Sequence, residues 1–245
     1  MKAELCIDNY EAAKLAQELG YDSVEVNSAL TLGGMTPPIG MVRKIANNLD
    51  IESMVMIRNR PAGFCYTDIE YEAMKEELEI LLRENITGIV FGFLTEGLEI
   101  DRERTKYFVD KAKAHGKLTM FHRAFDNTKD PYQAIETLID LGVDRVLTSG
   151  QSPKVEGGLE LLKELQTLYG HKIQIVAGSG VTPANVYEIV KKTGLRYVHS
   201  SNSYYATDLT TTGKVDYRIS TNLINEYQSV CEGKAKKFIK RVKNL

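Results

Sequence analysis

Apolar and polar stretches alternate along this chain in a regular order. Short strand-like apolar runs recur eight times, and segments with the spacing of amphipathic helices lie between them. This strict alternation predicts parallel strands joined by crossover helices. The predicted strands span residues 3–7, 22–27, 52–58, 86–92, 117–122, 143–148, 172–177 and 195–199. The predicted helices span residues 9–19, 37–48, 67–84, 101–114, 130–141, 153–168, 182–192 and 217–242.

Turn residues mark the ends of these helices and help to choose between two folds. Helix starts are indicated at Asp8-Asn9, Asp130-Pro131, Ser152-Pro153 and Thr182-Pro183. A doubly wound open sheet would need a glycine-rich turn after the first strand, and CIDNYEAA supplies none. We therefore predict an α/β fold in which residues 1–245 form a single (β/α)8 TIM barrel with a C-terminal helix.

The first two predicted strands each carry a pair of polar residues on one face. Glu4 and Cys6 are two residues apart, as are Glu25 and Asn27, so each pair shares a side of its strand. Helices cover the outer face of such a barrel, so these side chains are predicted to point into the lumen. Buried carboxylates need partners or acquire raised pKa values, and arginines at the barrel mouth are the expected partners.

Composition and charge exclude several classes of function. With 43% hydrophobic residues, the 245-residue chain can build the core of one barrel. A net charge of -2 argues against nucleic acid or anionic membranes as partners. No apolar run approaches the roughly 20 residues of a membrane span. Three distant cysteines and the N-terminal MKAELCID predict a cytoplasmic protein with free thiols. The basic residues from Lys234 to Lys243 are interpreted as the solvent face of the last helix.

Reactive side chains close several of the predicted strands. FHRAFD at 121–126 and LTSGQ at 147–151 are the main examples. TIM barrels keep their active sites at the carboxyl ends of the strands, so these residues are expected to share one mouth. His122 and His199 are candidates for an acid, a base or a ligand, or else are hydrogen-bonded structural histidines. The other mouth candidates in these motifs are Asp126, Ser149 and Gln151.

Three arginines are expected near the same mouth. Arg58 and Arg60 end the third strand, and Arg123 follows the fifth. Guanidinium groups grip carboxylates and phosphates, so the arginines are candidates for binding an anionic ligand. The alternative is that they neutralise the internal carboxylates Glu4, Glu25 and Asp126.

The loops after the seventh and eighth strands have the pattern of an anion site. TIM barrels often bind phosphate there, and glycine lets backbone amides approach an anion. The dipole of a helix starting behind Thr182-Pro183 would add to the attraction. The alternative is a tight turn with a serine N-cap. The candidate anion-binding residues in these loops are Ser179, Gly180, Ser200 and Ser201.

Metal-ligand motifs such as HxxxH or CxxC are absent from the sequence. Strand alternation, however, points Met54, Met56 and Met120 toward the lumen together with Cys6. Such a sulfur-rich interior suits Cu(I), whereas the alternative is ordinary apolar packing of the methionines.

Short motifs spread over about residues 3–201 resemble those of the CutC-type copper homeostasis family. FHRAFD and LTSGQ in this order are the most specific of them. The others are ELC at 4–6, GGMTP at 33–37, RNR at 58–60, FCY at 64–66, AGSGV at 177–181 and VHSS at 198–201. The resemblance implies a TIM barrel, a cytoplasmic location and self-association as dimers or tetramers. It also implies a role in copper tolerance and Cu(I) binding by cysteines near the first two strands.

The chain departs from this family at two places. Asn27 stands where the family usually has cysteine, so Cys6 is what remains of the implied thiol pair. Pro61-Ala62-Gly63 stands where the family tends to carry Gly-Gly-Asp before Phe64. One thiolate binds Cu(I) weakly unless methionines or a second subunit contribute.

Two functions therefore remain open, and we favour the first. The first is a cytoplasmic copper homeostasis protein that binds Cu(I) with Cys6 as principal ligand and needs no organic cofactor. The second is a lyase- or isomerase-like enzyme that acts by acid-base chemistry on a small phosphorylated or carboxylated metabolite. There Glu25 or His122 would move a proton, and Asp126 would orient a neighbour. A non-catalytic sensor of the same metabolite is a variant of the second function. Separately, the loop at 207–212 follows the eighth strand and is a candidate for a lid or a subunit contact.

Overall fold

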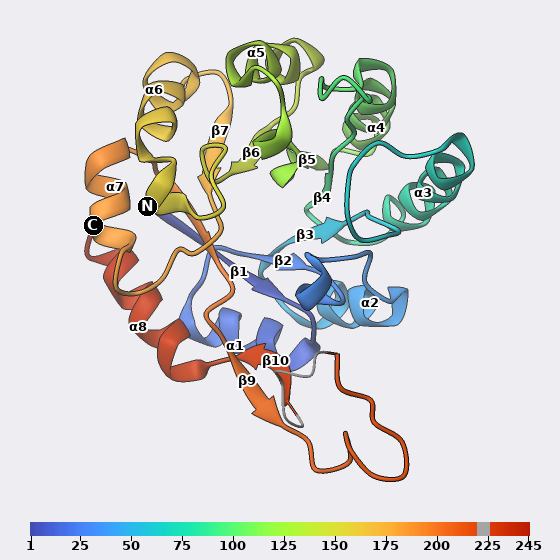
Figure 1. Ribbon diagram of the computed structural model, residues 1–245, viewed down its shortest axis with the longest axis vertical. Coiled ribbons are helices and arrows are strands. Elements are labelled where there is room, and N and C mark those ends of the chain that lie inside the picture. Colours follow the sequence, from blue (N-terminus) through green and yellow to red (C-terminus); the bar gives the residue numbers. More distant parts are fainter. Residues whose placement is uncertain (220–225) are drawn as a thin grey trace.

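Eight parallel strands close into a barrel, as predicted. The computed structural model describes residues 1–219 and 226–245. Each strand pairs with the next in sequence, and β8 pairs with β1 to close the ring. The helices lie around the outside of the barrel (Figure 1). The barrel strands are β1 (Lys2–Ile7), β2 (Ser23–Val26), β3 (Glu52–Met56), β4 (Gly88–Phe91), β5 (Leu118–Phe121), β6 (Arg145–Thr148), β7 (Gln174–Ala177) and β8 (Tyr197–Ser200). The α-helices are α1 (Tyr10–Leu19), α2 (Ile39–Asn48), α3 (Asp68–Leu81), α4 (Arg102–Ala114), α5 (Pro131–Leu141), α6 (Leu159–Tyr169), α7 (Val186–Thr193) and α8 (Glu232–Lys243).

At two of the predicted helix starts, the side chain of the residue that precedes the helix caps it. The Asn9 side chain accepts a hydrogen bond from the Ala12 amide at the start of α1. Asp130 accepts from the amides of Tyr132 and Gln133 at the start of α5, where Pro131 occupies the first turn. Both caps confirm the sequence signals, and they fix where the loops after β1 and β5 end.

Apolar side chains form two layers, one on each face of the barrel wall. The larger layer packs the strands against the helices. The smaller layer fills the lumen below the mouth, where Met54, Met56 and Met120 pack with Leu147 and Tyr197. The predicted inward direction of the methionines is confirmed, and their apolar contacts favour packing as the explanation. This plug closes the lumen, so access is from the carboxyl ends of the strands.

Two helices begin later than the sequence predicts. Helix α6 begins at Leu159 rather than at 153, and residues 155–157 form a short 3-10 helix instead. Helix α7 begins at Val186 rather than at 182, because the Asn185 side chain folds back and accepts from the Thr182 amide. The serine-proline and threonine-proline pairs thus mark turns that precede the helices.

The predicted final helix over 217–242 is wrong in its first half. Residues 226–230 form strand β10 (Glu226–Val230), which pairs antiparallel with β9 (Ser203–Thr207). Residues 220–225 of the predicted helix lie outside the described residues. Helix α8 then has its predicted amphipathic form, with Ala235 and Phe238 buried and its lysines exposed. The hairpin was missed because strand pairing depends on a partner distant in sequence, which local patterns do not reveal.

The part of the chain that the structure describes contains no helix long and apolar enough to cross a membrane.

Candidate functional site

A cavity of about 670 Å³ opens at the mouth of the barrel. It lies at the carboxyl ends of the strands, where the sequence placed the site. Most of the predicted site residues line it, namely Cys6, Glu25, Asn27, Arg58, His122, Arg123, Ser179, Gly180, His199, Ser200 and Ser201. The other predicted site residues do not line the cavity and can only support the residues that do. They are Glu4, Arg60, Asp126, Ser149 and Gln151.

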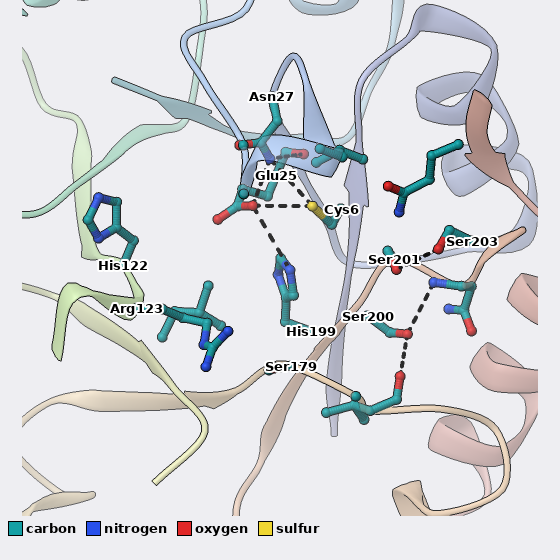
Figure 2. Close-up of a pocket in the computed structure, with 18 of the residues that line it drawn as sticks. Cys6, Glu25, Asn27, His122, Arg123, Ser179, His199, Ser200, Ser201 and Ser203 are labelled. Carbon is teal, nitrogen blue, oxygen red and sulfur yellow. Dashed lines mark hydrogen bonds and ion pairs between the residues drawn. The ribbon is translucent and has the colours of Figure 1, made fainter. Parts of the chain in front are cut away.

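Three potential metal ligands converge at the floor of this cavity. Cys6, Glu25 and His199 are all buried, and one ligand atom from each lies within 4.8 Å of the others. The Cys6 thiol donates to Glu25 Oε2 at 3.4 Å, and His199 Nε2 lies 3.9 Å from the same oxygen (Figure 2). Adjacent strands explain the convergence, because the register places Cys6 beside Glu25 and Glu4 beside His199.

Glu4 fixes the orientation of the His199 ring. Its Oε1 accepts a hydrogen bond from His199 Nδ1 at 3.0 Å, while its Oε2 accepts from Ser23 Oγ at 2.8 Å. With its proton on Nδ1, the imidazole turns Nε2 toward Glu25 and Cys6. A carboxylate that holds a histidine in this way is the usual support of a metal-binding imidazole. The expectation that arginines partner Glu4 and Glu25 is therefore wrong, because the strand register brings His199 to both carboxylates.

Burial and charge set the protonation of this cluster. Burial raises the pKa of the Cys6 thiol well above its usual value, and the neighbouring Glu25 carboxylate raises it further. Burial also raises the pKa of Glu25, although the charge of His199 opposes this. Burial disfavours charge on His199, but the carboxylates of Glu25 and Glu4 outweigh it and raise the His199 pKa. A metal bound here must therefore displace the Cys6 thiol proton and also the proton on His199 Nε2, which the raised pKa of His199 retains.

Asn27 stands next to Cys6 in this cluster. Its Nδ2 donates to Glu25 Oε2 at 2.7 Å and lies 3.4 Å from Cys6 Sγ. The position to which the resemblance assigns a cysteine is thus within contact distance of the Cys6 thiol. Asn27 holds the Glu25 carboxylate in place of contributing a second sulfur.

The two arginines after β3 lie in different surroundings. Arg58 is buried and lines the cavity, where it donates to the carbonyl oxygens of Gly33, Gly34 and Ala62 at 2.8–3.1 Å. Among the described residues no carboxylate pairs with it. Arg60 instead forms an ion pair with Glu70, with Nε 2.5 Å from Oε1, outside the cavity wall. Only the first of the two can contact a ligand in the cavity.

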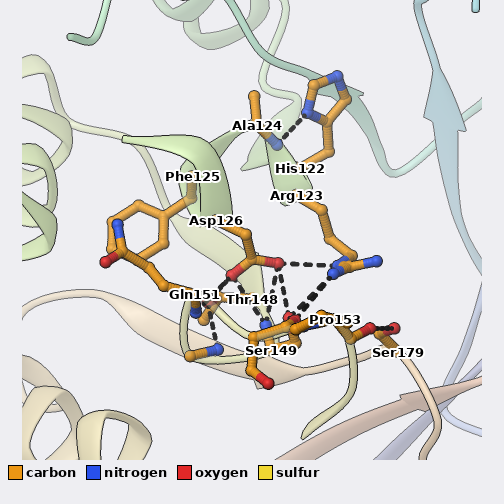
Figure 3. A network of polar contacts seen from close by, with 12 residues as sticks. His122, Arg123, Ala124, Phe125, Asp126, Thr148, Ser149, Gln151, Pro153 and Ser179 are labelled. Atoms are coloured by element: carbon orange, nitrogen blue, oxygen red, sulfur yellow. Dashed lines mark hydrogen bonds and ion pairs between the residues drawn. The ribbon is translucent and has the colours of Figure 1, made fainter. Parts of the chain in front are cut away.

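The FHRAFD and LTSGQ motifs form one network behind the cavity wall (Figure 3). Asp126 Oδ2 accepts from Arg123 Nε at 2.8 Å and from Ser149 Oγ at 2.9 Å. Its Oδ1 accepts from Thr148 Oγ1 at 2.6 Å and from the Gln151 amide at 3.1 Å. Asp126 thereby joins the loops after β5 and β6 and positions Arg123, which reaches the cavity.

His122 is held as a neutral imidazole. Its Nδ1 accepts from the Ala124 amide at 3.1 Å, and its ring lies against Phe64 with centroids 4.8 Å apart. Burial lowers its pKa to about 3, and the charge of Arg58 contributes to the shift. The proton therefore sits on Nε2, which has no hydrogen-bond partner within the described parts of the chain. His122 is suited to donate a hydrogen bond to a ligand rather than to accept a proton.

The serines of the predicted anion site make loop contacts. Ser179 Oγ donates to the Pro153 carbonyl at 2.8 Å, and Ser200 Oγ donates to the Val181 carbonyl at 2.6 Å. Because a hydroxyl has one proton, neither serine has a second one left for an anion. Ser201 and Gly180 remain at the cavity wall.

Sequence reasoning missed the contribution of the C-terminal segment to the cavity. Gln228 of β10 and Lys234 of α8 line it, as does Asn202 after β8. Lys234 had the pattern of a solvent-facing lysine, and it is indeed exposed, but its helix begins at the cavity rim. No local signal distinguishes it from the lysines that follow, since its position depends on the hairpin.

The cysteines should differ sharply in reactivity. Cys65 is exposed, whereas Cys6 is buried and its pKa is raised. Because the thiolate is the nucleophile, iodoacetamide at pH 7.5 should modify Cys6 at least about tenfold more slowly than Cys65. Peptide mass spectrometry over time measures both rates, and protein unfolded in urea is the control in which the difference should disappear. Equal rates in the folded protein would contradict the buried placement of Cys6.

A family model and two related proteins point to the same family. The family model described as the CutC family matches residues 1–204. The chain is 38% identical to a family protein CutC of Treponema denticola, over 81% of this chain and 80% of that protein. It is 40% identical to the copper homeostasis protein cutC homolog of Caenorhabditis elegans, over 83% of this chain and 81% of the other.

A solved structure agrees with these matches. The crystal structure of the putative copper homeostasis protein CutC from Streptococcus agalactiae superimposes with a TM-score of 0.77 at 28% identity. The superposition covers 82% of this chain and 98% of that one. Sequence motifs, barrel topology and relatives thus converge, and the chain belongs to the CutC family.

Proposed function

We propose that this protein binds Cu(I) through Cys6 and His199 and serves in copper homeostasis in the cytoplasm. The observation that carries the proposal is the buried cluster of Cys6, Glu25 and His199, whose ligand atoms lie within 4.8 Å of one another. The name of the related Caenorhabditis elegans protein supports copper as the metal. The three cysteines are free, which fits a reducing compartment.

The donor atoms favour two of the three residues as copper ligands. Cu(I) is a soft ion that prefers thiolate and also accepts imidazole, whereas carboxylate oxygen suits harder ions. Cys6 Sγ and His199 Nε2 are therefore the principal ligands in our proposal. Glu25 Oε2, 3.4 Å from the sulfur, is placed to take the thiol proton that copper displaces. Glu4 keeps His199 Nε2 directed at the copper position.

Copper handling is favoured over the acid-base enzyme. The relatives support copper, and one of the two groups assigned to move a proton is poorly suited to that task. His122 has a pKa of about 3 and accepts from the Ala124 amide, so it does not take up a proton near neutral pH.

The test is an oxygen-free Cu(I) titration of reduced protein against a competing chelator. Wild type should bind one Cu(I), and Cys6→Ser should weaken the affinity at least about 100-fold because the thiolate is lost. His199→Gln should weaken it by about 10–100-fold. The matched control is Cys65→Ser, which removes an exposed thiol away from the cluster and should bind as wild type does.

Circular dichroism spectra establish that each variant is folded. Cu(I) affinity unchanged in folded Cys6→Ser, or lost in Cys65→Ser, would overturn the proposal.

A further inference from the structure

We propose that the cavity above Cys6 and His199 binds a small organic anion that also carries a hydroxyl group. This inference does not depend on copper. The cavity measures about 670 Å³, which lies in the range of roughly 300–1,000 Å³ of small-molecule sites. A single metal ion at the floor would leave most of this volume to another ligand.

The charges in the wall favour an anion. Arg58, Arg123 and Lys234 line the cavity, whereas Glu25 is the one carboxylate in the described part of its lining. Arg123 is already paired with Asp126, but Arg58 is 5% exposed, donates only to backbone carbonyls through its two terminal nitrogens, and has no partner for Nε among the described residues. A buried charge without a counter-ion is costly, so an anionic ligand would stabilise this arrangement.

Five buried polar atoms of the cavity-lining residues have no hydrogen-bond partner among residues 1–219 and 226–245, namely the donors Arg58 Nε and His122 Nε2 and the acceptors Glu25 Oε1, Asn27 Oδ1 and Asn202 Oδ1. A ligand that both donates and accepts would satisfy atoms of both kinds, such as Glu25 Oε1 and His122 Nε2. In the close-up view, the Glu25 carboxylate has His199 and Cys6 on one side and His122 on the other (Figure 2). Its free oxygen accepts, and the protonated Nε2 of His122 donates. A hydroxyl group can serve as both donor and acceptor, which is why we include it in the ligand.

The rim of the site comes from a part of the chain beyond the family match. The CutC family model ends at residue 204, whereas Gln228 and Lys234 belong to the hairpin and helix that follow. Lys234 Nζ donates to the Ser203 carbonyl at 2.8 Å, and an ammonium group has two further protons to offer. The C-terminal segment thus adds a positively charged group to a cavity whose floor is built by the barrel.

Calorimetric titration of copper-free protein tests this inference with defined probes. The probes are ribose 5-phosphate and L-malate, as a phosphorylated and a carboxylated hydroxy compound, with D-ribose and inorganic phosphate as their reference compounds. At least one of the two organic anions should bind saturably with a Kd below about 1 mM, and D-ribose should not bind. Which of the two binds more tightly decides between phosphate and carboxylate.

Variants locate the binding. Lys234→Ala and Glu25→Gln should each lower the affinity for the probe that binds wild type at least about tenfold. Lys236→Ala removes an exposed lysine of the same helix outside the cavity lining and should leave affinity unchanged. Because this titration uses copper-free protein, its failure would leave the copper proposal standing, which separates the two tests. Absence of binding by both organic anions, equal binding of inorganic phosphate, or full affinity in both cavity variants would overturn the inference.

Discussion

Replacing Asn27 with cysteine should raise the affinity for Cu(I) at least about tenfold, equivalent to about 1.4 kcal/mol. The Asn27 amide lies 3.4 Å from Cys6 Sγ, so a thiol at this position would meet the existing one at the floor of the cavity. Two soft sulfur ligands bind Cu(I) better than one sulfur and one imidazole. The competition titration used for wild type measures the gain directly.

Asn27→Ser is the matched control for this prediction. It removes the same hydrogen bond from Asn27 to Glu25 Oε2 but adds no sulfur. Its Cu(I) affinity should stay near or below that of wild type. If the serine and cysteine variants bind equally, the copper position is not beside Cys6 and this part of the account fails.

Asp126→Asn should lower the free energy of unfolding by about 3 kcal/mol. The carboxylate of Asp126 is 7% exposed and accepts from Arg123, from Ser149 and from the backbone amide of Gln151. An amide group can offer only one oxygen to these donors and turns its NH2 group toward the rest. Buried donors left without an acceptor account for the expected loss.

Urea unfolding followed by circular dichroism measures this loss. Asp140→Asn is the control, because it makes the same chemical change at an exposed position of α5 and should cost less than about 0.5 kcal/mol. A loss below about 1 kcal/mol in Asp126→Asn would show that the network between the two loops contributes little to stability.

The architecture was predictable because it rests on local periodicity. Strands recur with alternating or continuous apolar residues, helices recur with their own spacing, and the alternation of the two fixes parallel order. The period of two along a strand also placed Glu4, Cys6, Glu25 and Asn27 on the lumen face, where the structure has them.

Contacts between distant segments were not predictable in this way. His199 partners Glu4 only because β8 pairs with β1 when the barrel closes, across 195 positions of the chain. Arg58 was expected to bind an anionic ligand or to neutralise an internal carboxylate, and its partners within the chain are instead carbonyl oxygens of the glycine loop at 33–34. Lys234 reaches the cavity through a hairpin whose strands carry no strong local signal.

The most direct test of the account is anomalous diffraction at the copper absorption edge, from crystals loaded with Cu(I) without oxygen. We predict one strong peak between Cys6 Sγ and His199 Nε2 at the floor of the barrel mouth, and its absence in crystals of Cys6→Ser. Copper found at other residues, with no peak between these two side chains, would contradict the account.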